Sequence, residues 1–178
     1  MRTIKLIIQY DGTNYCGWQE QTNGVSIQET VELALAKILG KRVRVQSSGR
    51  TDAGVHAVAM PAVFRTESTI PLKAFVDGVN THLPQDIAIQ SAEEVPSDFR
   101  AIGGARSKTY RYTIYNAPVR RPLNCRTSWH VRDQLDLQAM QKAAAYFIGE
   151  HDFAAFRGAN CSAVTSQRRI DQVSITRN

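Results

Sequence analysis

Hydrophobic and polar residues alternate in several short stretches of the first half of the chain, a pattern typical of half-buried β-strands. Residues 4–10 show it, as do residues 43–45 and 56–66, and Ile87-Ala88-Ile89 begins a further strand. Pro61 lies inside the third of these stretches. Because proline cannot donate a backbone hydrogen bond, we expect an edge or a bulge at that point.

Two segments between these strands have the spacing of amphipathic helices. Ser26 opens the first with a capping-box pattern, and Gly40 is placed to end it. Pro71, at a first-turn position, opens the second, which should stop near Leu83 because a proline follows. The element order β-α-β-β-α-β over residues 1–95 is ferredoxin-like. It predicts an α+β fold with an antiparallel sheet.

The second half of the chain begins with a similar set of elements. Further strands are expected at residues 107–115, 126–131 and 168–177. A helix is expected from Asp136, as N-cap, to Gly149. A second unit of the same kind would need more strands, so we expect an incomplete one. Pro and Gly mark residues 96–106 as the seam, which gives domains 1–98 and 99–178.

Positive charge is concentrated in one part of the sequence. The chain has 22 Lys and Arg against 16 Asp and Glu, a net charge of +6, and residues 99–132 hold eight of the basic residues and no acidic one. Aromatic residues are interleaved with them: Tyr110, Tyr112, Tyr115 and Trp129. Arginines beside aromatic rings suit a surface that binds phosphates and stacks bases, so this segment favours nucleic-acid binding. The alternative is a solvated strand face whose tyrosines reflect β-propensity.

Common catalytic and cofactor motifs are missing from the sequence. It has no G-x-S-x-G, no H-E-x-x-H and no Walker or dinucleotide glycine pattern, and its four histidines are scattered. Three widely separated cysteines without a CxxC pair disfavour a disulfide scaffold and a zinc ribbon. No apolar run approaches the roughly 20 residues of a membrane span, and we expect no signal peptide because the apolar segment at the N-terminus is too short. We therefore expect a cytoplasmic protein without a metal site or a membrane partner.

The remaining candidate for chemistry is a polar loop at residues 47–56 that contains a single acidic residue. Gly49 and Gly54 bracket Asp52, and glycines let a backbone approach a ligand closely. Arg50 nearby would hold the carboxylate ionised, so that it could act as a nucleophile or base. From the loop alone, an Asx-turn that merely shapes the chain is the preferred interpretation.

Residues 49–56, Gly-Arg-Thr-Asp-Ala-Gly-Val-His, resemble the signature loop of the tRNA pseudouridine synthase A family. Other segments resemble this family in the same order along nearly the whole chain: Tyr10-Asp11-Gly12, Gly17-Trp18-Gln19, Ser26-Ile27-Gln28-Glu29, Gly78-Val79-Asn80, residues 108–112 and His151-Asp152-Phe153. The resemblance implies isomerisation of uridine to pseudouridine at positions 38–40, in the anticodon stem-loop of tRNA. The N-glycosidic bond breaks, the base rotates, and a C-glycosidic bond forms.

The resemblance also implies roles for individual residues. Asp52 would be the catalytic aspartate that attacks the target uridine, at the base or at the sugar. Arg50 would help to displace the base from its stem, and Tyr110 would stack on the uracil. The basic segment at residues 99–132, and not the resemblance, supplies three further residues that we expect to contact the RNA: Arg106, Lys108 and Arg111. The family works as a homodimer on tRNA and needs no metal or organic cofactor.

Two features depart from the family pattern. Ile102 and Gly103 stand where the family usually has an arginine and an aromatic residue. A motif resembling F-x-x-x-M-V-R-N, whose arginine pairs with the catalytic aspartate, is missing. We therefore expect an N-terminal portion of the enzyme, with little or no activity by itself.

Two other functions remain open from the residues alone. One is a non-catalytic RNA-binding module that uses its sheet as a stacking platform, as an RRM does. Asp52→Asn separates it from a synthase, because only a synthase has turnover to lose. The other is a metabolic enzyme with a small anionic substrate, against which strongly salt-dependent tRNA binding would argue.

Overall fold

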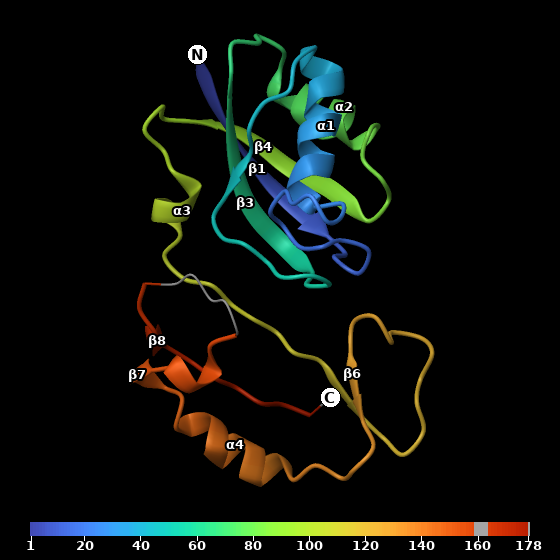
Figure 1. The fold of residues 1–178 in the computed structure, drawn as a ribbon, viewed down its shortest axis with the longest axis vertical. Coiled ribbons are helices and arrows are strands. Elements are labelled where there is room, and N and C mark those ends of the chain that lie inside the picture. The colour runs from blue at the N-terminus through green and yellow to red at the C-terminus, as the bar shows by residue number, and fades with distance from the viewer. Residues whose placement is uncertain (159–163, 178) are drawn as a thin grey trace. The chain divides into compact units, whose positions relative to one another are not determined.

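The structure is a computed structural model that describes residues 1–158 and 164–177 (Figure 1). It divides into two compact units, Met1–Tyr110 and Arg111–Asn178. The boundary between the units therefore lies beyond the expected seam at residues 96–106. Among the described residues, no helix is both long enough and apolar enough to span a bilayer.

A four-stranded antiparallel sheet is the frame of the first unit. From edge to edge it contains β2 (Gln46–Ser47), β3 (Ala57–Thr66), β1 (Arg2–Tyr10) and β4 (Ile87–Val95). The helix α1 follows β1, α2 follows β3, and both lie on the same face of the sheet (Figure 1). This is the strand order of the ferredoxin-like fold, so the structure confirms the predicted α+β class and ferredoxin-like first unit.

The helix α1 (Ile27–Leu39) begins and ends where local signals in the sequence predict. The Ser26 hydroxyl accepts a hydrogen bond from the backbone N–H of Glu29 at 3.2 Å, which caps the first turn. Gly40 ends the helix with a φ of 71°, and its N–H donates to the Ala36 carbonyl. This left-handed conformation is one that glycine adopts without steric cost.

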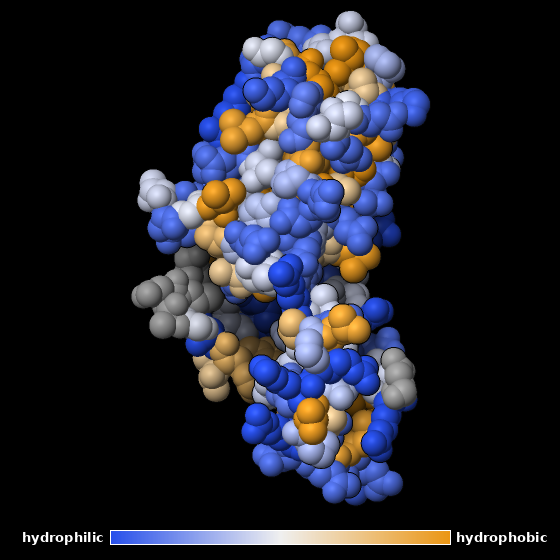
Figure 2. All heavy atoms as spheres, turned by 90° about the vertical axis from the view of Figure 1, so that its right-hand side faces the viewer, coloured by the Kyte–Doolittle hydropathy of each residue, from blue (hydrophilic) through white to orange (hydrophobic). Residues whose placement is uncertain are grey.

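The core of the first unit lies between the helices and one face of the sheet. Ile4 and Leu6 of β1 are fully buried, because alternate side chains of a strand point to the same face. Phe64 of β3 packs edge-on against Phe75 of α2 (Leu72–Asn80), with ring centroids 5.3 Å apart. Each such side chain stabilises the fold by roughly 1.5–3 kcal/mol. On the face shown in Figure 2, hydrophobic side chains of this unit are scattered among hydrophilic ones.

The described residues of the second unit form two small sheets and one α-helix. Its elements are β5 (Ile114–Asn116), β6 (Trp129–Val131), α4 (Leu137–Ala145), β7 (Gly149–Asp152), a single turn of 3₁₀-helix (Ala154–Phe156) and β8 (Gln167–Ile170). The strands β5 and β6 pair in parallel, and β7 and β8 pair antiparallel. The Asp136 carboxylate accepts hydrogen bonds from the N–H groups of Gln138 and Ala139, so it caps α4 as predicted.

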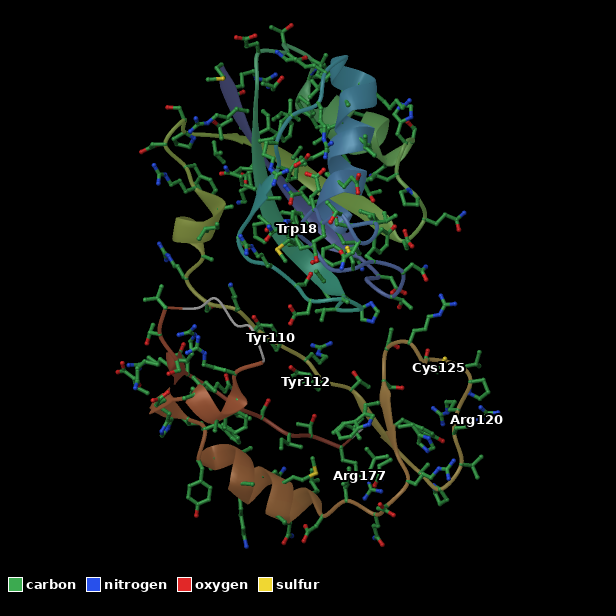
Figure 3. All side chains as sticks on the ribbon, in the orientation of Figure 1. Trp18, Tyr110, Tyr112, Arg120, Cys125 and Arg177 are labelled. Carbon is green, nitrogen blue, oxygen red and sulfur yellow. The ribbon has the colours of Figure 1, made fainter. Side chains whose placement is uncertain are left out.

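The predicted strand at residues 107–115 is wrong over most of its length. After α3 (Ala101–Gly104), residues 107–113 carry no regular structure, and pairing begins only at Ile114; Figure 3 labels Tyr110 and Tyr112 on this segment. Their spacing suits a strand, but the described part of the chain offers no neighbouring strand for their backbone groups. For the same reason the other two predicted strands shorten to residues 129–131 and 167–170.

Side chains of the second unit are mostly exposed. Among its described residues, Ala144 is the one hydrophobic residue in the buried class. Four large aromatic residues are each at least 70% exposed: Tyr112, Trp129, Tyr146 and Phe156. Hydrogen bonds connect the segments of this unit. The Asn116 amide, for example, donates to the carbonyls of Val131 and Asp133 at 2.9 and 2.7 Å.

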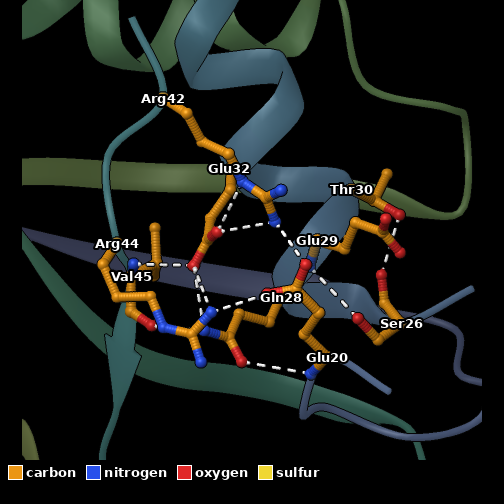
Figure 4. A network of polar contacts seen from close by, with 9 residues as sticks. All are labelled: Glu20, Ser26, Gln28, Glu29, Thr30, Glu32, Arg42, Arg44 and Val45. Carbon is orange, nitrogen blue, oxygen red and sulfur yellow. Dashed lines mark hydrogen bonds and ion pairs between the residues drawn. The ribbon is translucent and has the colours of Figure 1, made fainter. Parts of the chain in front are cut away.

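The strand before the polar loop also differs from its prediction. Alternation at residues 43–45 predicts a strand there, but pairing with β3 starts at Gln46. Val45 is held by two side chains of α1 instead (Figure 4). Its N–H donates to a Glu32 carboxylate oxygen at 2.9 Å, and its carbonyl accepts from the Gln28 amide at 3.0 Å. Side chains of a helix thus take the place of a neighbouring strand.

Pro61 is tolerated inside β3 because β2 is so short. It pairs with Ile7 of β1, and its carbonyl accepts a hydrogen bond from the Ser48 N–H at 2.8 Å, just past the end of β2. The N and C=O of one strand residue face the same neighbour, so the proline nitrogen also points toward β2 and away from β1. No hydrogen bond between β1 and β3 is lost.

Candidate active site

Two loops meet at one end of the sheet in the first unit. Tyr10, the last residue of β1, pairs with Ala57, the first residue of β3. The loop after β1 (residues 11–24, the β1 loop) and the loop before β3 (residues 48–56, the Asp52 loop) therefore leave the sheet side by side. The strand pairing thus brings the candidate catalytic residue next to a second, glycine-containing loop.

The residue before Asp52 is held through both its backbone and its side chain. The Trp18 N–H donates to the Thr51 carbonyl at 3.0 Å, and the Tyr10 hydroxyl lies 2.9 Å from the Thr51 hydroxyl. Tyr10 and Trp18 are core residues, 3% and 2% exposed, with ring centroids 6.0 Å apart; Figure 3 labels Trp18. Burial raises the pKa of Tyr10, although its hydrogen bond to Thr51 acts in the opposite direction. The phenol therefore keeps its proton at neutral pH.

Two glycines let the β1 loop touch the Asp52 loop. A Cβ on Gly12 would lie 2.1 Å from the Val55 carbonyl oxygen, and one on Gly17 would lie 2.5 Å from the Thr51 carbonyl oxygen. Gly17 also has a φ of 110°, a region that favours glycine. Any side chain at these two positions would push the loops apart, so both glycines set the spacing of the site.

Hydrogen bonds fasten the other end of the Asp52 loop. The Gly12 N–H donates to Nδ1 of His56 at 3.1 Å, and this nitrogen lies 2.9 Å from an Asp11 carboxylate oxygen. In the β1 loop, the Tyr15 hydroxyl donates to the Asp86 carboxylate at 2.6 Å. Burial, and then this carboxylate, raises the pKa of Tyr15, so its proton stays in the hydrogen bond. His56 serves here to join the two loops.

Asp52 itself is exposed, and its carboxylate forms no hydrogen bond or ion pair with any residue that the structure describes. Its backbone carbonyl accepts from the Val55 N–H at 3.2 Å. In an Asx-turn the carboxylate itself would accept a backbone N–H. The loop is therefore not shaped by such a turn, and the carboxylate is available to a ligand.

Arg50 is exposed as well, but it does not form an ion pair with Asp52. Within residues 1–158 and 164–177, the Arg50 guanidinium forms no ion pair or hydrogen bond at all. The expectation that Arg50 holds the Asp52 carboxylate ionised therefore has no contact to support it. Both side chains are accessible to a ligand.

Lys108 is the predicted RNA-binding residue that the structure brings to this loop. A Cβ on Gly49 would lie 2.6 Å from Lys108 Nζ, so the ammonium group lies against the Gly49 backbone. Arg106 is exposed, and the Tyr110 ring is 68% exposed without a stacking partner among the described residues. Arg111 is exposed and belongs to the second unit. No group of three or more His, Cys, Asp or Glu residues in the described part could hold a metal ion.

A family model described as tRNA pseudouridine synthase matches residues 6–102, more than half of the chain. This chain belongs to the tRNA pseudouridine synthase family. The match to the synthase includes both loops of the candidate site, and with them Asp52 and its neighbour Thr51. It does not reach four of the other predicted site residues, Arg106, Lys108, Tyr110 and Arg111.

Similarity to individual synthases extends over almost the entire chain. The tRNA pseudouridine synthase A of Pelobacter propionicus is 63% identical over 175 residues, which cover 98% of this chain and 72% of that protein. The enzyme of the same name from Geotalea uraniireducens is 57% identical over 178 residues, covering 100% and 73%. That of Geobacter sulfurreducens is 56% identical over 176 residues, covering 99% and 72%. The chain thus spans a little under three quarters of the length of these synthases.

The sequence predicts Asp52 as the catalytic residue, but it gives no sign of the residues that hold its loop. Tyr10 and Thr51 are 41 residues apart, and no local pattern links them. The signal that could have found them is the strand order. In a ferredoxin-like unit the first strand pairs with the third, so the end of one meets the beginning of the other.

Proposed function

We propose that this chain isomerises uridine to pseudouridine in tRNA, with Asp52 as its catalytic residue. The observation that carries the proposal is the exposed carboxylate of Asp52 on a loop whose backbone is held at Thr51. A nucleophile must be accessible to substrate and also held in a reactive geometry. The names of the relatives, tRNA pseudouridine synthase A, support the substrate class.

The reaction is an isomerisation, so it needs no second substrate. A carboxylate oxygen of Asp52 attacks the target uridine at the base or at the sugar, and the N1–C1′ glycosidic bond breaks. The detached uracil rotates and C5 bonds to C1′. If Asp52 attacked the sugar, its bond to C1′ breaks as the C5–C1′ bond forms; if it attacked the base, its bond to the base breaks afterwards. In both cases the C5 proton leaves, N1 gains a proton, and the carboxylate is regenerated.

A uridine in a paired stem must leave the helix before Asp52 can reach it. Extrusion costs a few kcal/mol, which stacking and phosphate contacts offset. In our proposal Arg50 helps to displace the base and the exposed ring of Tyr110 stacks on the uracil. Three basic residues bind the RNA backbone: Lys108, which lies against the Asp52 loop, with Arg106 and Arg111.

We place the targets at positions 38–40 of the anticodon stem-loop and the active species as a cytoplasmic homodimer. The family resemblance of residues 49–56 supports these assignments. The net charge of +6 favours a polyanionic partner. Because A-form RNA hides its base edges in a deep groove, substrate choice should rest on shape and phosphate contacts.

Release of tritium from tRNA labelled at uridine C5 tests the proposal, because it follows loss of the C5 proton. The activity expected of this chain is low, so protein is used in excess over tRNA to detect a single round of the reaction, and we expect Asp52→Asn to abolish the release. The affinity for tRNA should change less than about twofold, since binding rests on other groups. Asp98→Asn, which changes another exposed carboxylate of the first unit, should leave both quantities unaltered.

The same assay decides for or against the non-catalytic alternative. An RNA-binding module would bind tRNA in a salt-dependent manner without releasing tritium, and Asp52→Asn would change nothing. Binding without release, with the unsubstituted chain in excess, would show that the proposed activity is wrong for this chain.

A further inference from the structure

A pocket of about 430 Å³ lies within the second unit, under the loop of residues 117–128 that joins β5 to β6. Its aromatic and basic lining residues are Tyr115, Arg120, Arg121, Trp129 and His130. Figure 3 labels Arg120 and Cys125 on this loop. The volume falls in the range of sites that hold small ligands, roughly 300–1,000 Å³. None of the roles assigned above uses this pocket.

Three of the lining residues contact one another: Arg121, Tyr115 and His130. The Arg121 guanidinium lies 4.6 Å from the centroid of the Tyr115 ring, a cation–π arrangement. The centroids of the His130 and Tyr115 rings lie 5.6 Å apart, and Nε2 of His130 donates a hydrogen bond to the Ala117 carbonyl at 2.8 Å. These contacts hold the Tyr115 and His130 rings in place.

Two other lining residues have no such contacts. Trp129 is 70% exposed and stacks on no other ring among the described residues. Arg120 is exposed and forms no hydrogen bond or ion pair within the described part of the chain. Two arginines and no carboxylate line the pocket, so its positive charge favours the binding of an anionic ligand.

We infer that this pocket binds an unpaired nucleotide of the RNA substrate, with the phosphate on Arg120 and the base against Trp129. This inference rests on the proposed function, because it takes RNA as the substrate. A free phosphate would satisfy Arg120 but leave the exposed indole unused, whereas every base offers a face for stacking. The pocket belongs to the second unit, and Asp52 belongs to the first.

The fluorescence of Trp129 tests the inference directly. The chain has two tryptophans, and Trp18 is only 2% exposed, so a stacked base should quench mainly Trp129. We expect a single-stranded oligouridylate to quench the fluorescence of the full chain. Trp129→Phe, which keeps an aromatic face, should lose the signal, and inorganic phosphate at equal ionic strength should not produce it. Quenching by phosphate alone would overturn the nucleotide assignment.

Arg120→Gln tests the phosphate contact. We expect tRNA affinity to fall about tenfold and the slope of log K against log salt to lose about 0.7–1 unit, as for one phosphate contact. Lys142→Gln removes the same charge from an exposed position on α4 and should leave both quantities within about twofold. Equal behaviour of the two variants would overturn the inference. Tritium release reports separately on Asp52, so intact quenching without release would reject the proposed activity and leave the pocket standing.

Discussion

At the scale of single residues, the contacts of Thr51 with Trp18 and Tyr10 position the backbone that carries the Asp52 carboxylate. The Asp52 side chain has no partner among the described residues, so the backbone before it fixes its position. There the Thr51 carbonyl accepts from Trp18, and the Thr51 hydroxyl is bonded to Tyr10. Because the backbone is already held, Asp52 loses only the rotational freedom of its side chain when it contacts the substrate. This lowers the entropy cost of reaching a reactive geometry.

Gly17→Ala tests how tightly the spacing of the two loops is set. The new Cβ would lie 2.5 Å from the Thr51 carbonyl oxygen, on a backbone with a φ of 110°. Clash and backbone strain add, so we expect the free energy of unfolding in urea to fall by about 2–4 kcal/mol. Tritium release should also fall, because Thr51 must move and Asp52 follows it.

Gly40→Ala is the matched control for this variant. Gly40 also has a positive φ, of 71°, but a Cβ there would meet nothing within 4 Å. It therefore carries the backbone strain without the clash, and we expect a loss of about 1–2 kcal/mol. Equal losses for the two variants would contradict the close approach of the loops at Gly17.

At the scale of elements, a polar network ties α1 to both segments that lead into the site (Figure 4). The Glu32 carboxylate is 1% exposed and accepts hydrogen bonds from the Val45 N–H at 2.9 Å and from Arg42 at 3.0 Å. Arg42 also donates to Glu20 of the β1 loop at 2.7 Å. The Arg42 and Arg44 guanidinium groups lower the pKa of Glu20, which keeps its carboxylate charged in this network.

Glu32→Gln should weaken this connection without changing the size of the side chain. An amide nitrogen would face donors, which leaves at least one of the Val45 and Arg42 groups unsatisfied. We expect the free energy of unfolding in urea to fall by about 1–3 kcal/mol. Glu29→Gln, in the first turn of the same helix, loses only a helix-dipole interaction and should cost less than about 1 kcal/mol. A Glu32→Gln loss no larger than that of Glu29→Gln would argue against a structural role for the network.

The sequence predicts an element well where the signals that define it are local. The cap at Ser26 and the stop at Gly40 lie within the helix they bound, so both ends of α1 are found correctly. The prediction of a strand at residues 43–45 is wrong because the backbone of Val45 bonds to side chains of α1, up to 17 residues earlier. Residues 107–113 have the alternation of a strand but lack a neighbour among the described residues, and alternation cannot supply one.

At the scale of the whole molecule, the two units differ in how much they bury. The first has a continuous core in which β1, β3, α1 and α2 all take part. In the described part of the second, Ala144 alone belongs to the buried hydrophobic residues. Since burial of apolar surface is the main favourable term in folding, most of the stability of this chain should reside in the first unit.

Amide hydrogen exchange, followed by mass spectrometry, tests this difference in stability. The strand β1 is paired with β3 on one side and with β4 on the other, so its amides should exchange only when the whole unit unfolds. The strands β5 and β6 form a two-stranded sheet, and we expect their amides to exchange at least about a hundredfold faster. Saturating tRNA should slow exchange in the loop at 117–128 if its pocket binds a nucleotide, and should change β1 little. Equal protection of β1 and β6 in the free chain would contradict the assignment of stability to the first unit.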